Sequence, residues 1–133
     1  PKTETVVPEL PTVTKSEEPV VGSTDPLRDR QAQGYNLYAQ GVQLYLNGDS
    51  ARAFDLLTRA ISVYPRDARY FYYRAMAGAA SSDYSIRSGV TEDLRKGADL
   101  ERKGYPDGYV VMQSMERIQG PMRAWLNKHR PLD

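Results

Sequence analysis

The chain has 133 residues, room for one domain, and its 18 basic and 17 acidic side chains leave a formal net charge of +1. So balanced a charge gives no long-range field to gather nucleic acid or an anionic membrane. The absence of cysteine excludes disulfides, thiol nucleophiles and thiolate metal sites. No apolar stretch approaches the roughly 20 residues that cross a bilayer, so we expect no membrane insertion by this segment.

Residues 1–24 are rich in Pro, Thr and Glu and contain no aromatic residue. All ten Tyr, both Phe and the single Trp lie at or after Tyr35. A segment without such side chains cannot bury enough apolar surface to offset chain entropy, so it is predicted to be a flexible linker or tail. We expect residues 25–133 to form the folded domain.

A helix is predicted to begin at Asp25-Pro26, because Asp caps free amides of the first turn and Pro fits the first helical position. Apolar residues then recur at helical spacing as far as Leu46, and Asn47-Gly48-Asp49 ends the helix. Asp49 or Ser50 caps a second helix, which ends before Pro65 because proline has no amide to donate.

Four further helices are predicted, separated by Ser-, Gly- and Pro-rich breaks. They run from about Asp67 to Ala80, from about Val90 to Lys103 and from Asp107 to Gln119, with a short last helix that carries Met122, Trp125 and Leu126. Residues 81–89 (SSDYSIRSG) lack a helical period and are predicted to be a loop. Gly120-Pro121 is predicted to break the chain before the last helix.

Two helix ends look alike, because each runs into Tyr-Pro, at Tyr64-Pro65 and again at Tyr105-Pro106, before a polar start to the next helix. Similar helix pairs at a spacing of about 30 to 45 residues indicate stacked hairpins. Residues 34–67 form one such unit, and residues 68–106 form a second, longer and irregular one.

The unit at residues 34–67 resembles a tetratricopeptide repeat. The small, apolar and terminal positions of that family are matched by Gly41, Ala53, Leu57, Ala60 and Pro65. Small residues at the crossing let two antiparallel helices approach to within about 8–10 Å. The unit departs from the family at Leu37 and Leu44, where aromatics are usual, and at Gln40; in the second unit Phe71 and Ala75 match, but Arg74 and Gly78 do not.

The resemblance implies an all-α fold of antiparallel helix hairpins, stacked as a short right-handed solenoid with a C-terminal capping helix pair. It also implies a protein–protein interaction module, an adaptor or scaffold that binds a protein or peptide segment without a cofactor. Two repeats leave their ends open, so homo- or hetero-oligomerisation through an open end is the natural alternative.

In the family that the chain resembles, the first helix of each pair lines a concave groove for peptides. Carried over by position, the partner-binding residues are Tyr35, Tyr38, Val42, Tyr45, Arg69, Tyr72 and Met76. Tyr suits such a surface because it pairs a rigid apolar ring with a hydroxyl at low entropy cost. The same stripe would also serve as core between the hairpins, and the sequence leaves both readings open.

No catalytic or metal-binding constellation is visible. The single histidine, His129, lies where a helix C-terminus favours a cation, and no calcium-loop or His-Glu motif is present. The acidic pairs Glu92-Asp93 and Asp99 with Glu101 are predicted to be solvated helix-surface charges beside Arg95, Lys96 and Arg102. The C-terminal cations Arg117, Arg123, Lys128, His129 and Arg130 are predicted to serve helix ends rather than nucleic acid.

We therefore expect no enzyme activity, and an enzyme built on scattered carboxylates is the least favoured alternative. A structural subunit of a larger complex, whose N-terminal tail wraps a neighbour, is the second hypothesis after an adaptor. The sequence opens at Pro1 rather than Met, from which we expect that an upstream segment was removed. The tail and the cysteine-free repeats favour a periplasmic or otherwise extracytoplasmic location over the cytoplasm.

Overall fold

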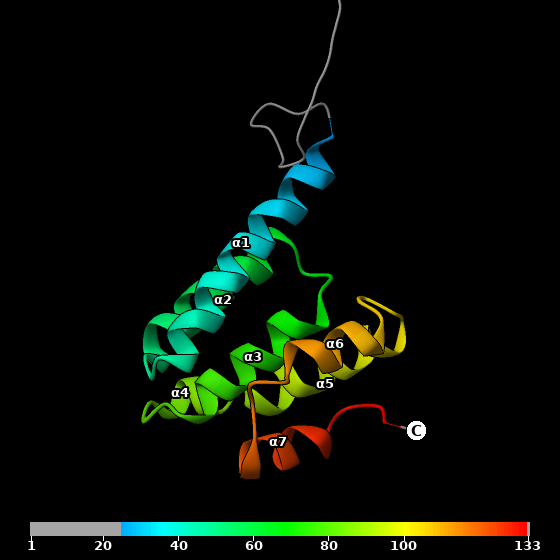
Figure 1. The fold of residues 1–133 in the computed structure, drawn as a ribbon. Helices are drawn as coiled ribbons and strands as arrows, with labels where there is room; N and C mark the ends of the chain where they lie inside the picture. Colours follow the sequence, from blue (N-terminus) through cyan, green and yellow to red (C-terminus); the bar gives the residue numbers. More distant parts are fainter. Residues whose placement is uncertain (1–24, 133) are drawn as a thin grey trace, which may run out of the picture.

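The structure, a computed structural model, describes residues 25–132, which are all-α. Six longer helices and the single turn α4 follow one another in this range (Figure 1). They are α1 (Pro26–Leu46), α2 (Ser50–Val63), α3 (Ala68–Ala79), α4 (Tyr84–Arg87), α5 (Val90–Arg102), α6 (Gly108–Ser114) and α7 (Gly120–Asn127). None of these helices combines the length and the apolar character that a membrane span needs. The predicted tail at residues 1–24 lies outside the described part of the chain.

The predicted ends of α1 and α2 are confirmed, and their caps explain them. The Asp25 carboxylate accepts a hydrogen bond from the Arg28 amide at 3.1 Å, which satisfies a free donor of the first turn of α1. Gly48 then adopts a left-handed φ of +91°, which turns the chain back. The Asp49 carboxylate caps α2 by accepting from the Arg52 amide at 3.1 Å.

Helices α1 and α2 pack antiparallel with almost no space at their crossing. A Cβ atom placed on Gly41 would lie 2.9 Å from Cγ of Leu57 and 3.5 Å from the carbonyl oxygen of Ala53. Leu57, Ala53 and Ala60 are fully buried. The predicted close contact is thus confirmed, because hydrogen at Gly41 leaves the room that the Leu57 side chain fills.

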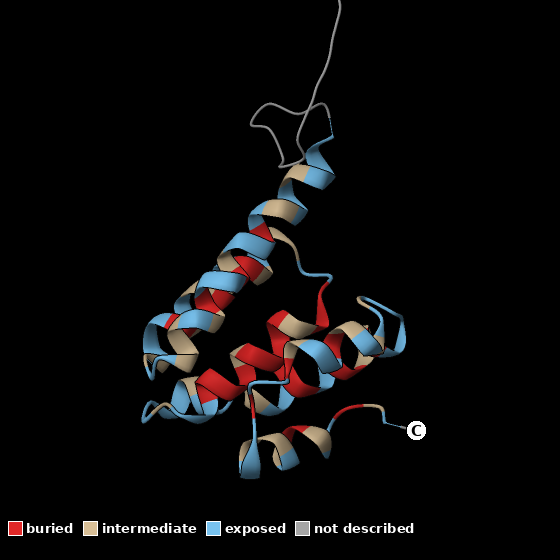
Figure 2. Ribbon diagram, viewed as in Figure 1, coloured by how far each residue is buried: buried red, intermediate tan, exposed pale blue. Residues whose placement is uncertain are grey.

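Helix α3 is the centre of the domain. It packs against α2 on one side and α5 on the other, and it also touches α1, α4 and α6. Nine of its 12 residues are buried, and Figure 2 shows it as the most continuous buried stretch of the fold. A Cβ atom on Gly97 of α5 would lie 2.8 Å from Cε1 of Tyr72, so this crossing is as tight as the first.

The two Tyr-Pro turns lie side by side. The amide of Ala68, at the start of α3, donates to the carbonyl oxygen of Tyr105 at 2.8 Å. The Arg66 guanidinium lies 5.7 Å from the centre of the Tyr105 ring, within the range of a cation–π contact. These contacts join the end of the first hairpin to the end of the second.

Three predicted boundaries are wrong. The expected loop at residues 81–89 contains α4, which forms because the Asp83 carboxylate accepts from the Ser85 amide at 2.9 Å. Helix α6 ends at Ser114 rather than Gln119. Beyond its end the Arg123 guanidinium donates to two backbone carbonyl oxygens, that of Met115 at 2.8 Å and that of Ile118 at 3.1 Å. Gly120-Pro121 begins α7 instead of breaking the chain, with the proline in the first turn, where it needs no donor.

Two carboxylates predicted to be solvated are buried ion-pair partners instead. Asp93 of α5 is 6% exposed, and its oxygens accept from Nε and Nη2 of Arg74 on α3 at 2.9 and 2.8 Å. Helical spacing could not identify this pair, because the two residues meet only when α3 and α5 pack together. Fork-to-fork geometry of this kind fixes the relative position of the two helices.

Glu101 of α5 is the second buried carboxylate, 7% exposed, and it holds the C-terminal segment in place. Arg130 donates to it through Nη2 at 2.6 Å and Nε at 3.1 Å. The Tyr72 hydroxyl donates to the same carboxylate at 2.8 Å. Burial raises the pKa of Tyr72, and this hydrogen bond raises it further. The predicted role of Arg130 as a helix-end cation is therefore wrong.

Substitution Gly41→Val should lower the free energy of unfolding by about 2 kcal/mol, because the added side chain has no space beside Leu57. Urea denaturation followed by circular dichroism measures this change. Gly89→Ala is the control, since a Cβ there meets its nearest atom, the Ile86 carbonyl oxygen, at an ordinary 3.7 Å. Equal stability of the Gly41→Val variant and the parent would refute the close crossing.

Substitution Arg130→Ala should destabilise the domain by about 3 kcal/mol, because it leaves Glu101 buried without its cation. The double variant Glu101→Gln, Arg130→Met should recover much of that loss, since neither charge remains. Arg95→Ala, which breaks ion pairs at a side chain that is 59% exposed, should change stability far less than Arg130→Ala, because solvent screens exposed ion pairs. A buried pair predicts this order of effects; equal losses for Arg130→Ala and Arg95→Ala would contradict it.

Candidate functional site

Five tyrosines from α1 and α3 meet where these two helices touch. This tyrosine cluster comprises Tyr35, Tyr38 and Tyr45 of α1 with Tyr70 and Tyr73 of α3. Tyr38 is its centre, with its ring 5.6 Å from that of Tyr35, 5.1 Å from Tyr70 and 5.8 Å from Tyr73, measured between ring centres. The Tyr45 ring meets the edge of Tyr73 at 6.2 Å. These spacings are those of favourable aromatic pairs.

Helical geometry explains why the cluster forms. Tyr35, Tyr38 and Tyr45 stand three and seven residues apart, so they share one face of α1. Tyr70 and Tyr73 stand three apart on α3 and meet that face. The Tyr73 hydroxyl, in addition, donates to the carbonyl oxygen of Ser114, which attaches α6 to the cluster.

Arg69 covers the open edge of the cluster. Its guanidinium carbon lies 5.4 Å from the centre of the Tyr35 ring and 5.1 Å from that of Tyr38. Asp67 holds this position through two bonds, Nε to Oδ1 at 3.0 Å and Nη2 to Oδ2 at 2.7 Å. Burial alone would lower the pKa of Arg69, but the hydrogen bonds and charge of Asp67 outweigh it and raise the pKa, so the cation is permanent and locally compensated.

The predicted partner-binding residues divide into two groups. Tyr35 is 48% exposed, and Val42, Tyr45 and Arg69 are partly exposed along the same helix contact. Tyr38 is only 6% exposed, and Tyr72 and Met76 are not exposed at all. Placing these last three on an open surface is wrong, because α3 has helices on several sides and Tyr72 faces Gly97 and Glu101 of α5. Partner binding by the first group stays a prediction.

Helix α6 carries two exposed side chains that the sequence reasoning did not select. Tyr109 is 61% exposed and Met112 is 40% exposed, three residues apart. Their position in the repeat could have indicated them, since α6 follows the second Tyr-Pro turn as α3 follows the first. The irregular second unit obscured that signal.

Within residues 25–132 no three His, Asp or Glu side chains gather in a way that would hold a metal ion. His129 is exposed and meets the Trp125 ring at 5.7 Å between ring centres. The buried carboxylates Asp93 and Glu101 are both occupied by arginines.

Comparison with protein-family models, with curated proteins and with solved structures finds no match to this chain. The tetratricopeptide resemblance therefore rests on the sequence of the two units alone, and the structure shows an all-α domain of packed helix hairpins.

Stability should fall with rising pH at the alkaline end, because burial raises the pKa of Tyr38 from 10.0 to about 12, with smaller opposing effects from Arg69 and the Ser114 side chain. The folded state then keeps a proton that the unfolded state loses, so the contribution of Tyr38 is complete below pH 10 and disappears as the pH approaches 12. Tyr38→Phe should reduce the slope of unfolding free energy by about 1.4 kcal/mol per pH unit in this window. Tyr84→Phe, at a ring that is 74% exposed, is the control and should leave the slope as it is.

Proposed function

We propose that the chain is a non-catalytic interaction module of the tetratricopeptide kind, which binds a segment of a partner protein along the exposed edge of the tyrosine cluster. The two hairpins support this proposal. Helices α1 and α2 form the first, α3 and α5 the second, and α2 packs on α3. Such an arrangement is the start of a stacked-hairpin array, in which the first helices of successive pairs share one face.

The observation that carries the proposal is the position of Tyr35 and Tyr45. Both rings belong to the packed cluster, yet Tyr35 is 48% exposed and Tyr45 is partly exposed. Their buried neighbours Tyr38 and Tyr73 hold these two rings in place. When a partner covers them, the two side chains therefore lose little conformational entropy. Tyr and Arg anchors with this support are the residue types that dominate binding energy in protein interfaces.

The charge of this face limits the class of partner. Arg69 is the cation that lies against the rings of Tyr35 and Tyr38, and Asp67 compensates it through two hydrogen bonds. A clamp for a peptide carboxylate would need cations that are free to bind it. We therefore infer that the partner segment contributes apolar or proline side chains to the tyrosines rather than a cluster of carboxylates.

Affinity capture from the source cell with the full chain tests the proposal. The double variant Tyr35→Ala, Tyr45→Ala should lose roughly tenfold or more of the captured partner, since anchor residues each contribute more than about 1 kcal/mol. Tyr84→Ala removes an exposed tyrosine from α4, far along the chain from the cluster, and should capture as the parent does.

Thermal unfolding of each variant shows whether its fold is intact. A folded Tyr35→Ala, Tyr45→Ala variant that captures the same proteins as the parent would refute the proposed face. Equal losses in that variant and in Tyr84→Ala would show that capture depends on tyrosine content rather than on this site.

A further inference from the structure

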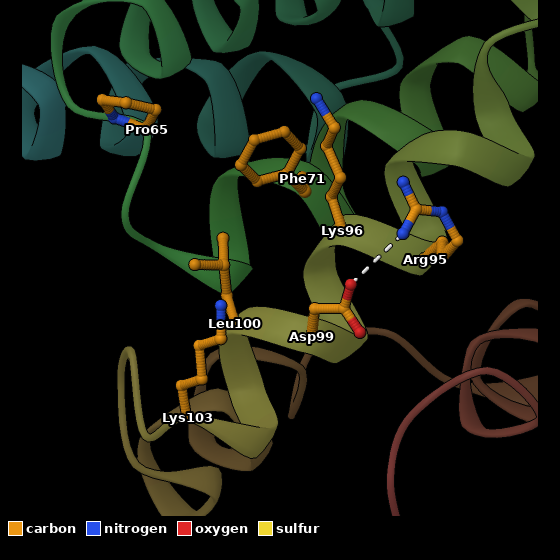
Figure 3. Close-up of a pocket in the computed structure, with 7 residues that line it drawn as sticks. All are labelled: Pro65, Phe71, Arg95, Lys96, Asp99, Leu100 and Lys103. Atoms are coloured by element: carbon orange, nitrogen blue, oxygen red, sulfur yellow. Dashed lines mark hydrogen bonds and ion pairs between the residues drawn. The ribbon is translucent and has the colours of Figure 1, made fainter.

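A hollow with a basic rim lies away from the tyrosine cluster, between the turn that joins α2 to α3 and the side of α5 (Figure 3). Its volume is about 300 Å³. The residues that line it are Pro65, Phe71, Arg95, Lys96, Asp99, Leu100 and Lys103. Three of them are apolar, three are basic and one is acidic, so the lining carries a net charge of +2 (three positive charges minus one).

The single acidic side chain of the lining is already neutralised. Asp99 accepts from Nη1 of Arg95 at 3.3 Å and from Nη1 of Arg102 at 3.0 Å. Arg95 also pairs with Glu92. The positive charge that remains belongs to the two lysines.

Lys96 and Lys103 form no ion pair with any residue of the described range 25–132. Figure 3 shows Lys96 beside the Phe71 ring and Lys103 beside Leu100. The Lys96 Nζ atom lies 5.9 Å from the centre of that ring, so the cation lies at the border of an apolar surface. A ligand that matches this hollow supplies carboxylates for the lysines and small apolar side chains for Pro65, Phe71 and Leu100.

Two other hollows lack this combination. The one lined by Ser50, Phe54 and Ile86 has Asp55 as its charged side chain, and the one lined by Gln33, Leu37 and Val63 has Arg59. Neither has two cations without a partner. The match to an acidic, apolar segment is therefore a property of the hollow beside α5.

We propose that the hollow beside α5 binds residues 17–21 of this same chain, Glu-Glu-Pro-Val-Val. Glu17 and Glu18 carry the two negative charges that the lining lacks, and Pro19, Val20 and Val21 follow them as small apolar side chains. Such a contact is independent of the proposed partner-binding face, because it uses neither the tyrosine cluster nor Arg69.

The chain is long enough to make this contact within one molecule. A Cβ on Gly34 would touch the Cβ of Tyr64 at 2.9 Å, so Gly34 marks the level of the turn that carries Pro65. Asp25 lies nine residues before Gly34, about 14 Å along α1 at roughly 1.5 Å per residue. Residues 18–24 span roughly 24 Å when extended, which exceeds that distance by about 10 Å. Tethering also gives the segment a local concentration on the order of millimolar.

The absence of cysteine allows a direct test on the full chain. A nitroxide spin label on Ser16→Cys, next to the proposed segment, should broaden the amide signals of Lys96, Leu100 and Lys103 in a ¹⁵N-labelled protein. Glu17→Lys with Glu18→Lys should lower the ratio of docked to undocked molecules roughly tenfold, because two exposed ion pairs become repulsive contacts. Lys96→Glu with Lys103→Glu should do the same, and the four substitutions together should restore the broadening.

The control variant Arg117→Glu, Lys128→Glu changes the net charge equally at exposed residues outside the hollow, and should leave the broadening unchanged. Broadening that survives both charge reversals, or that the fourfold variant does not restore, would overturn the proposal. So would broadening that appears only when spin-labelled chains are mixed with ¹⁵N-labelled chains, since the occupant would then be a second copy. Signals that shift with an added Glu-Glu-Pro-Val-Val peptide, while the attached label leaves them sharp, would assign the hollow to an external acidic segment and overturn it too.

Discussion

The close approach of the two helices within each hairpin is the constraint on which the rest of the structure depends. Gly97 admits the Tyr72 ring on the α5 side, and Gly41 admits Leu57 where α1 crosses α2, so that both hairpins close without a gap. Because helices pack on several sides of α3, its run of aromatic residues becomes core. The aromatic hydroxyls then need partners, which Glu101 and the Ser114 carbonyl supply. The ion pairs and the position of α6 thus follow from the burial of α3.

Buried charge gives this small core its register. Apolar side chains alone would tolerate rotation of α5 on α3. The bidentate Arg74–Asp93 ion pair, in contrast, forms in only one relative position of the two helices. Glu101 does the same for the C-terminal segment, because it binds Arg130 and Tyr72 at once. The cost of burying these charges is offset only while both partners are present. The C-terminal segment therefore belongs to the folded domain and is held by more than α7.

Local signals predicted the six longer helices of this fold, whereas the misplaced charges and the misassigned face depend on contacts between residues far apart in sequence. Asp25, Asp49 and the Gly48 turn specify the first hairpin through neighbours in sequence, which is why its ends were predictable. Asp93 and Glu101 were assigned to solvent because their arginines are 19 and 29 residues away. The error in the predicted partner-binding face has the same origin. Helical spacing identifies the residues on one side of α3, but the packing of α5 and α6 decides that Tyr72 and Met76 are buried.

The net charge of the chain is nearly neutral, but the local charge differs between the tyrosine cluster and the hollow beside α5. At the tyrosine cluster Asp67 compensates Arg69, so that face offers aromatic rings with little free charge. Beside α5 the arginines compensate Asp99, and two lysines next to Phe71 and Leu100 have no ion-pair partner within residues 25–132. A net charge of +1 rules out a strong long-range field, but an ion pair acts within a few ångströms and depends on the local balance. In our two proposals these surfaces take different segments, one apolar and one acidic, and the residues that would bind them are not shared.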